Sequence, residues 1–186
     1  MNTATATHYP AATFVEPIET RTLCVLVDNE PGVLARVIGL FSGRGYNIES
    51  LTVSETEHEE HLSRITIVTT GTRMVIEQIK NQLDRLVPIH RVVDMTEAGR
   101  AIQRELAMVK VRGKGDERIE ALRLADAFRA RVIDATIESF VFEITGATDK
   151  IDKFVSLMIP LGLVEVSRTG VVAIARGPEG MGARPA

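Results

Sequence analysis

The sequence predicts an α+β fold that contains two ferredoxin-like βαββαβ domains, and three observations lead to this prediction. The chain has 186 residues, more than one ordinary domain needs and enough for two small ones. Hydrophobic residues make up 45% of the chain but aromatic residues only 4%, so we expect cores of Val, Ile and Leu in sheets that helices cover. Finally, the same order of strand and helix patterns occurs twice along the chain.

The first unit begins with a β-rich run at residues 22–27, which stops at the turn residues 28–32. Pro31 suits the first position of a helix, because the N–H that proline lacks has no partner there. Apolar residues then follow at helical spacing and predict a helix from about Pro31 to Ser42. Gly43 supplies a permissive backbone that ends this helix.

A strand is predicted next, from Tyr46 to Val53. Its apolar phase slips between Ile48 and Leu51, whereas the side chains of a strand alternate between two faces. The slip predicts either a bulge near Glu49 and Ser50 or a strand that is apolar on both faces. In both cases we expect Ile48 to turn away from the main core.

The remaining elements complete the first βαββαβ order. Residues 55–60 are acidic and are predicted to form a hairpin tip, with the returning strand at 62–70. Thr72 can cap a helix with one apolar face, and a last strand follows at 89–94. The apolar face of that helix is formed by Val75, Ile76, Ile79 and Leu83.

The order then recurs after a predicted linker at residues 96–105. The second unit, residues 106–177, should contain a strand at 106–111, a helix, a hairpin, a second helix that opens at Thr148, and a last strand at 164–174. The apolar positions of its first helix are Ile119, Leu122, Ala125 and Phe128. The hairpin strands are expected at 132–137 and 140–145. Loose composition predicts flexible tails at residues 1–20 and 178–186.

Charge, cysteine content and hydropathy argue against several functional classes. The net charge of −3 disfavours nucleic-acid binding, which depends on Lys and Arg that neutralise phosphates. Cys24 is the single cysteine, so an intramolecular disulfide cannot form, and a reducing cytoplasm fits. No apolar run approaches the roughly 18 residues that a membrane span requires, and residues 1–20 lack the Lys and Arg of a signal or transit peptide. We therefore expect a cytoplasmic protein with no membrane or nucleic-acid partner.

Two motifs that resemble catalytic or cofactor sites do not fit their chemistry. His58 and His61 are three residues apart, whereas the helical zinc motif places its histidines four apart. Gly113 and Gly115 lie between a strand and a helix, but Arg118 stands where a dinucleotide loop has its third glycine. A solvated hairpin tip and a tight turn explain these segments better. We expect no catalytic residue and no metal site in this chain.

The turn before the first helix has chemistry suited to an α-amino acid. The first amides of a helix lack intrahelical partners and favour an anion such as a carboxylate. Gly32 allows close approach, and two asparagines offer amide oxygens to an ammonium group. Aliphatic neighbours predict a small apolar ligand side chain. The candidate ligand residues are Asn29, Gly32, Val33, Leu34, Asn47 and Ile48. On the residues alone, the simpler interpretation stays open that Asn29 caps the helix and Gly32 makes a turn.

A longer pattern around this turn resembles a known family. Residues Asp28 to Leu51, DNEPGVLARVIGLFSGRGYNIESL, strongly resemble the opening of the acetolactate synthase (acetohydroxyacid synthase) small subunit. The similarity continues through residues 62–69, the helix around Ile79, and the segments 105–110 and 164–176. Only the two tails fall outside it.

This resemblance implies that residues 21–95 form an ACT domain, which pairs with the ACT domain of a second copy. Valine, the end product of the pathway, is the usual effector at that interface. Matched residue by residue, its contacts would fall on the six candidate residues, with Asn47 and Ile48 reaching in from the second copy. The catalytic large subunit, a different chain, would carry thiamin diphosphate, Mg and FAD, and no cofactor is expected in this chain.

Two other functional classes stay open at this point. A free-standing ACT-type amino-acid sensor, or a gene regulator with such a domain, would share the ligand-binding turn, although a basic DNA-reading segment is lacking. A small enzyme on the same scaffold is also conceivable, because this architecture hosts many functions. The sequence does not say whether leucine or isoleucine also act, or how many chains assemble.

Overall fold

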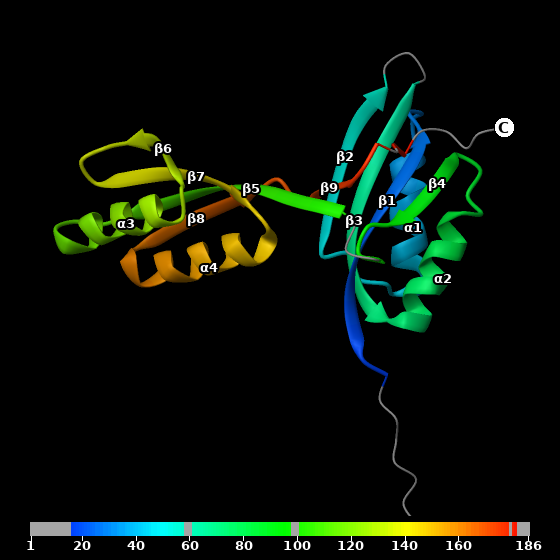
Figure 1. Ribbon diagram of the computed structural model, residues 1–186, viewed down its shortest axis with the longest axis horizontal. Helices are drawn as coiled ribbons and strands as arrows, with labels where there is room; N and C mark the ends of the chain where they lie inside the picture. The colour runs from blue at the N-terminus through cyan, green and yellow to red at the C-terminus, as the bar shows by residue number, and fades with distance from the viewer. Residues whose placement is uncertain (1–15, 58–60, 98–100, 179, 182–186) are drawn as a thin grey trace, which may run out of the picture.

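The structure is a computed structural model that describes residues 16–57, 61–97, 101–178 and 180–181 (Figure 1). It contains two βαββαβ units, as the sequence predicts. Most of both predicted tails lies outside the described residues. The first strand nevertheless begins at Ile18, so the prediction of a loose tail as far as residue 20 is wrong at its end.

The first unit is a four-stranded antiparallel sheet with two helices on one face (Figure 1). The strand order is β2-β3-β1-β4, in which β1 is central and pairs with both β3 and β4. This order is that of the ferredoxin-like fold. The elements are β1 (Ile18–Asp28), α1 (Val33–Arg44), β2 (Ser50–Glu57), β3 (Leu62–Thr72), α2 (Arg73–Leu83) and β4 (Ile89–Asp94).

Aliphatic side chains fill the space between this sheet and its helices. Alternate residues of β1 point to the helices because strand side chains alternate between the faces of a sheet. Phe41 of α1 is buried among them and meets Tyr46 edge to face, with 6.1 Å between the ring centroids. The buried residues of this core are Leu23, Val25, Val27, Val33, Val37, Phe41, Ile65, Ile67, Ile76, Ile79 and Leu83.

Local structure near α1 differs from the prediction in three ways. Pro31 lies in a turn and the helix begins at Val33, because Gly32 takes a left-handed conformation (φ 90°) that serves as the N-cap. Ile48 is half-buried and packs against the core, so the expectation that it turns away is wrong. The irregular pairing of β2 lies between Glu55 and Glu57, near the hairpin tip, instead of near Ser50.

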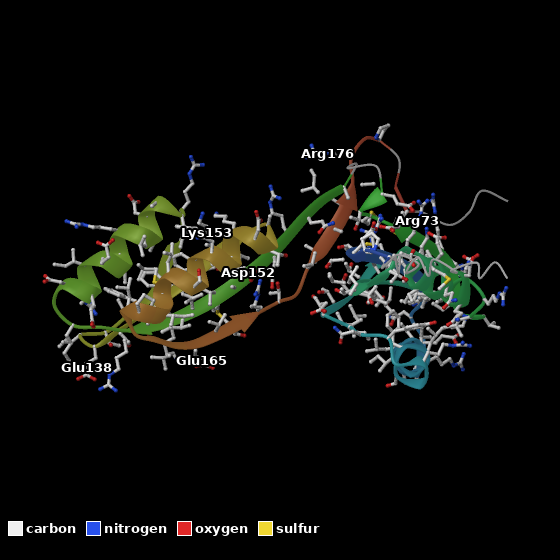
Figure 2. The ribbon with its side chains drawn as sticks, turned by 90° about the horizontal axis from the view of Figure 1, so that it is seen from below. Arg73, Glu138, Asp152, Lys153, Glu165 and Arg176 are labelled. Atoms are coloured by element: carbon white, nitrogen blue, oxygen red, sulfur yellow. The ribbon has the colours of Figure 1, made fainter. Side chains whose placement is uncertain are left out.

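The second unit repeats the arrangement, with helices α3 and α4 on one face of its sheet (Figure 2). The strand order β6-β7-β5-β8 matches that of the first unit. On the opposite face, Lys110 and Glu165 form an exposed ion pair at 3.0 Å. The elements are β5 (Ala101–Arg112), α3 (Asp116–Ala127), β6 (Arg131–Ala135), β7 (Ser139–Gly146), α4 (Thr148–Met158), the short 3-10 helix η2 (Ile159–Leu161), β8 (Leu163–Arg168) and β9 (Val172–Ala175).

Aromatic packing anchors the second core. Phe154 is fully buried and lies 5.4 Å from Phe128 and 6.1 Å from Phe142 between ring centroids. Helix α3 is turned differently from the prediction, since Ala121 and Ala125 are buried while two of the four predicted apolar positions, Ile119 and Leu122, are 51% and 39% exposed. Small alanine side chains let this helix approach the core closely.

A single long strand joins the two units, which corrects two predictions. Residues 101–105 belong to β5 instead of a linker, and residues 98–100 lie outside the described residues. The predicted last strand, 164–174, is divided into β8 and β9. The start of β5 pairs with β9, whereas its later part pairs with β7 and β8 (Figure 1).

The β5–β9 ribbon covers the face of the first sheet that lies opposite its helices. Cys24 of β1, Met95 and Ala173 of β9 form a small buried cluster there. A hydrogen bond from Thr22 Oγ1 to Gln103 Oε1 (3.3 Å) adds to this contact. The first sheet is therefore covered on both faces, once by its own helices and once by the last strand of the chain.

Candidate functional site

The turn between β1 and α1 presents backbone donors to solvent. The amide of Arg36 donates to Gly32 O (3.0 Å) and so closes the first helical turn, whereas the amide of Val33 makes only a long contact with Glu30 O (3.4 Å). The amides of Leu34 and Ala35 come before Arg36, the first donor of the helix, and have no intrahelical acceptor. Together with the positive end of the helix dipole, they form a place for an anion.

Gly32 leaves the space in front of these amides open. A Cβ atom at this position would meet no heavy atom within 4 Å, so the backbone is accessible. Its φ of 90° is one that other residues rarely adopt, which explains why glycine suits the site. Asn29 is exposed next to it, and the backbone N–H of Asn29 donates to His61 O at 2.6 Å. This hydrogen bond fixes the turn against the start of β3.

The side chains of Val33 and Leu34, the next two predicted residues, lie in different surroundings. Val33 is 4% exposed and its side chain belongs to the core, so only its backbone can reach a ligand. Leu34 is 37% exposed, and Ile38, one helical turn further, is 38% exposed. These two form an exposed apolar strip that begins beside the free amides.

The other half of the predicted site lies in the connection between α1 and β2. Asn47 is exposed, and its Nδ2 donates to Glu49 Oε1 (2.6 Å), which leaves its amide oxygen to accept a donor. Its backbone carbonyl accepts from Thr69 Oγ1 (2.6 Å). Ile48 is half-buried beside it.

The six candidate residues lie apart from the four cavities found among the described residues. None of the six lines the cavity at the junction of the two units, the one beside the β6–β7 hairpin, or those beside α2. The turn has the chemistry to hold a carboxylate and lies outside these four cavities.

Metal-binding side chains do not cluster in the part of the chain that the structure describes. No three His, Cys, Asp or Glu side chains stand close enough there to hold a metal ion. Burial raises the pKa of the Cys24 thiol, which favours its protonated form. None of the helices described is long and apolar enough to span a membrane.

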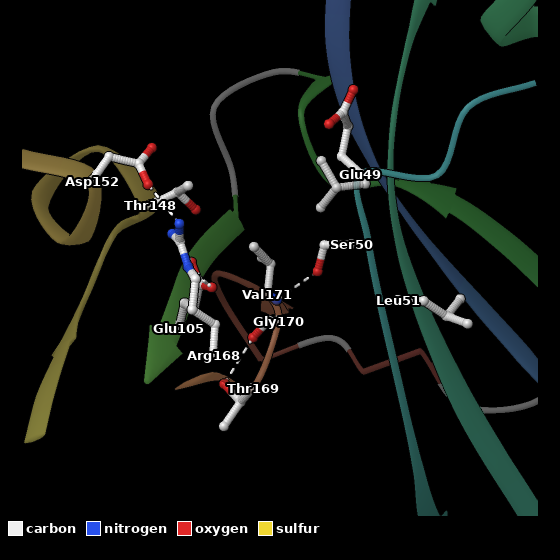
Figure 3. Close-up of a pocket in the computed structure, with 11 residues that line it drawn as sticks. Glu49, Ser50, Leu51, Glu105, Thr148, Asp152, Arg168, Thr169, Gly170 and Val171 are labelled. Atoms are coloured by element: carbon white, nitrogen blue, oxygen red, sulfur yellow. Dashed lines mark hydrogen bonds and ion pairs between the residues drawn. The ribbon is translucent and has the colours of Figure 1, made fainter. Parts of the chain in front are cut away.

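A cavity of about 480 Å³ lies where the two units meet, and no local sequence pattern predicts it (Figure 3). Its central side chain, Arg168, binds Glu105 through Nε (2.6 Å) and Nη2 (2.8 Å) and Asp152 through Nη1 (2.7 Å). The hydrogen bonds to Glu105 raise the pKa of Arg168 above its usual range. The lining residues are Glu49, Ser50, Leu51, Val68, Glu105, Thr148, Asp152, Arg168, Thr169, Gly170 and Val171.

Both units match described protein families. Residues 23–91 match the acetohydroxyacid synthase small subunit-like ACT domain, and residues 104–177 match the family described as small subunit of acetolactate synthase. The two matches fall on the two structural units, and β5 continues from the gap between them into the second.

Relatives named acetolactate synthase small subunit align over most of the chain. The probable acetolactate synthase small subunit of Archaeoglobus fulgidus is 47% identical over 84% of this chain and 96% of its own length. The acetolactate synthase small subunit of Mycobacterium leprae is 44% identical over 89% of this chain and 96% of its own. The crystal structure of acetolactate synthase small subunit from Thermotoga maritima superimposes with a TM-score of 0.77 at 37% identity, covering 87% of this chain and 99% of that chain. This chain belongs to the acetolactate synthase small-subunit family.

Proposed function

We propose that this chain is the regulatory subunit of acetolactate synthase, which raises the activity of the catalytic large subunit and makes it sensitive to feedback inhibition by valine. The observation that carries the ligand assignment is the open turn at Gly32, where free helix amides face solvent. The family match over both units supports the assignment to a larger enzyme. The chain itself would catalyse nothing.

Each part of valine has a partner in this proposal. The carboxylate accepts from the amides of Leu34 and Ala35 at the start of α1. The ammonium group donates to the side-chain oxygens of Asn29 and Asn47. The isopropyl group packs on Leu34 and Ile48, while Val33 contributes its backbone alone. Since no charged side chain is required, selectivity would come from the size of the apolar pocket.

The site becomes complete in a homodimer of ACT domains. Leu34 and Ile38 of α1 are the exposed apolar residues next to the turn, and a second copy that covers them would exclude water from the ligand. In this arrangement Asn29 and Leu34 come from one chain, and Asn47 and Ile48 from its partner. Valine therefore binds the dimer, and its occupancy changes how the two copies are held.

The cofactors of the reaction belong to the large subunit in this proposal. Thiamin diphosphate, Mg and FAD would bind there, and the enzyme would act in the cytoplasm in the synthesis of valine, leucine and isoleucine. Regulation is then a coupling between two sites on different chains, and valine must bind one state of the complex better than the other.

Reconstitution with the catalytic subunit tests this function. Acetolactate formation is measured for the catalytic subunit alone, with this chain, and with this chain plus valine. We expect higher activity on addition of the chain and inhibition on addition of valine. If the chain neither raises activity nor confers sensitivity, the proposed function is wrong.

Substitution at Gly32 tests the site. Gly32→Asp places a carboxylate where the carboxylate of valine should sit, so inhibition should disappear while activation persists. Gly32→Asn is the matched control, because it has the same size and tolerates a positive φ but carries no charge. It should keep more of the response to valine. Equal inhibition in wild type and Gly32→Asp would contradict the assignment.

A free-standing ACT-type amino-acid sensor is the alternative. It would bind valine through the same turn, so a binding measurement cannot separate the two functions. The discriminating measurement is the activity of the catalytic subunit, which such a sensor would leave unchanged at every concentration of the chain.

A further inference from the structure

The connection between β8 and β9, residues 169–171, is hydrogen-bonded to strand β2 of the first unit (Figure 3). We call these residues the crossover segment. The amide of Val171 donates to Ser50 Oγ (3.1 Å), and Thr52 Oγ1 donates to Thr169 O (3.3 Å). Two polar contacts thus connect the second unit to the beginning of β2.

Gly170 makes this contact close. Its φ is 83°, and a Cβ atom there would lie 2.7 Å from both Ser50 Oγ and Thr52 Oγ1. Rotation of either hydroxyl could relieve the overlap, but each is held by its hydrogen bond to the crossover segment. Any larger residue at 170 must therefore break the bonds that seat the segment on β2.

On the side of the first unit, this seat adjoins the proposed ligand residues. Ser50 follows Asn47, Ile48 and Glu49 in the chain, and the Glu49 amide donates to Val68 O (2.8 Å) on β3. Glu49 also accepts from Asn47 Nδ2 (2.6 Å). A ligand that displaces the Asn47 side chain would also move Glu49, its hydrogen-bond partner, which directly precedes Ser50 in the chain.

On the side of the second unit, the crossover segment is fixed to a rigid corner. The amide of Thr169 donates to Leu106 O (3.0 Å), and the Leu106 amide donates to Thr169 Oγ1 (3.2 Å). The adjacent Arg168 binds Glu105 on β5 and Asp152 on α4. Displacement of the segment would consequently move β5 and α4 together.

We infer that the crossover segment transmits the occupancy of the valine site to the second unit through its seat on Ser50 and Thr52. The inference rests on the proposed function, because it names the route by which valine acts beyond its own site. The apolar β5–β9 ribbon holds the units together whether or not the segment is seated, since its cluster around Cys24 and Ala173 is separate from these hydroxyls. Opening the seat would expose Val171, which is 5% exposed, so this side chain adds apolar burial to the two hydroxyl contacts.

Gly170→Ala is the direct test in the reconstituted holoenzyme. Gly177→Ala is the matched control, because Gly177 also has a positive φ (98°) but a Cβ there meets nothing within 4 Å. Both variants bear the same type of backbone strain, and only Gly170→Ala disturbs the seat. Ser50→Ala removes the hydroxyl that accepts from Val171 without adding an atom, so it tests the same contact in a variant that adds no overlap.

Two quantities are compared: the Kd of valine for the small subunit alone, and the factor by which the catalytic subunit changes that Kd. Allosteric coupling in proteins is typically about 5–150-fold. We expect Gly170→Ala and Ser50→Ala to bind valine within about 3-fold of wild type when alone, and to reduce the coupling factor towards one. Inhibition of acetolactate formation should weaken in parallel, while Gly177→Ala behaves as wild type.

The outcomes separate this inference from the proposed function. If wild type itself shows no response to valine, the proposed function fails. If wild type responds and both Gly170→Ala and Ser50→Ala keep its coupling factor, the seat does not transmit the signal and the inference is overturned. Loss of valine binding by the isolated variants would also overturn it, because the segment would then shape the ligand site.

Discussion

Replacement of Arg168 by methionine should destabilise the second unit by leaving a buried carboxylate without its partner. Glu105 is 5% exposed and binds Arg168 through two parallel hydrogen bonds, the geometry in which guanidinium and carboxylate interact most strongly. Methionine keeps the aliphatic part of the side chain and its packing, so the change removes mainly charge and hydrogen bonds.

The magnitude follows from the burial of the two carboxylates. Removal of one partner from a fully buried ion pair typically costs about 3–5 kcal/mol. Arg168 is itself 34% exposed, so water can reach Glu105 in the variant, and we expect a smaller loss of about 2 kcal/mol. The side chain of Asp152 is 56% exposed, and its contact should contribute less than about 1 kcal/mol.

Urea unfolding can assign this loss to the correct unit. Circular dichroism follows both units, and fluorescence of Tyr46, measured in a Tyr9→Phe background, follows the first unit alone. Arg168→Met should lower the midpoint of the circular dichroism transition more than the midpoint of the Tyr46 signal. Asp152→Asn is the control for the exposed arm of the network.

A second substitution identifies the cause. If the loss comes from an unpaired buried charge, Glu105→Gln in the Arg168→Met background should recover about 1 kcal/mol, because a neutral amide is easier to bury. A loss below about 0.5 kcal/mol in Arg168→Met, or no recovery with Glu105→Gln, would refute the reasoning.

Three further predictions concern stability and thiol chemistry. Phe154→Ala should lower the free energy of unfolding by about 3–5 kcal/mol, because Phe154 is fully buried between Phe128 and Phe142, and equal stability in urea would contradict the core assignment. Thr72→Ala should cost about 0.5–1 kcal/mol in thermal unfolding, since its hydroxyl accepts from the Val75 amide at 3.4 Å and caps α2, and an unchanged melting temperature would show that the cap contributes nothing. Burial raises the pKa of the Cys24 thiol above 9.0. The unfolded chain then loses this proton at a lower pH than the folded protein, so the contribution of the thiol to folding is lost as pH rises from 9 through the raised pKa. Wild type should lose stability relative to Cys24→Ala between about pH 8 and pH 10, and parallel curves would count against this burial effect.

Much of the fold follows from local patterns in the sequence. The two βαββαβ orders, the cap at Thr72 and the apolar face of α2 depend on residues close together in the chain, and the structure confirms them. The start of α1 was harder to predict. Pro31 and Gly32 both suit a helix start. The left-handed conformation of Gly32 makes this residue the N-cap, so the helix begins at Val33.

The structure places the candidate site residues in different surroundings, and the reason is again local geometry. Asn29, Gly32 and Leu34 are exposed where helix chemistry places them, but Val33 is drawn into the core by the phase of α1. The corner around Arg168 has no local signature. Arg168 and Glu105 are 63 residues apart, and only the pairing of β5 with β8 brings them together.

The boundary between the two units depends on strand pairing that local sequence patterns do not indicate. Residues 101–104 look like a linker because they pair with β9 alone and lie on the outer face of the first sheet, so no long apolar run marks them. Yet the same strand continues into the centre of the second sheet. Because β5 is a member of both packing arrangements, a shift of its register or twist cannot be confined to one unit. The hydrogen bonds of the crossover segment add a second connection between the two units beside β5.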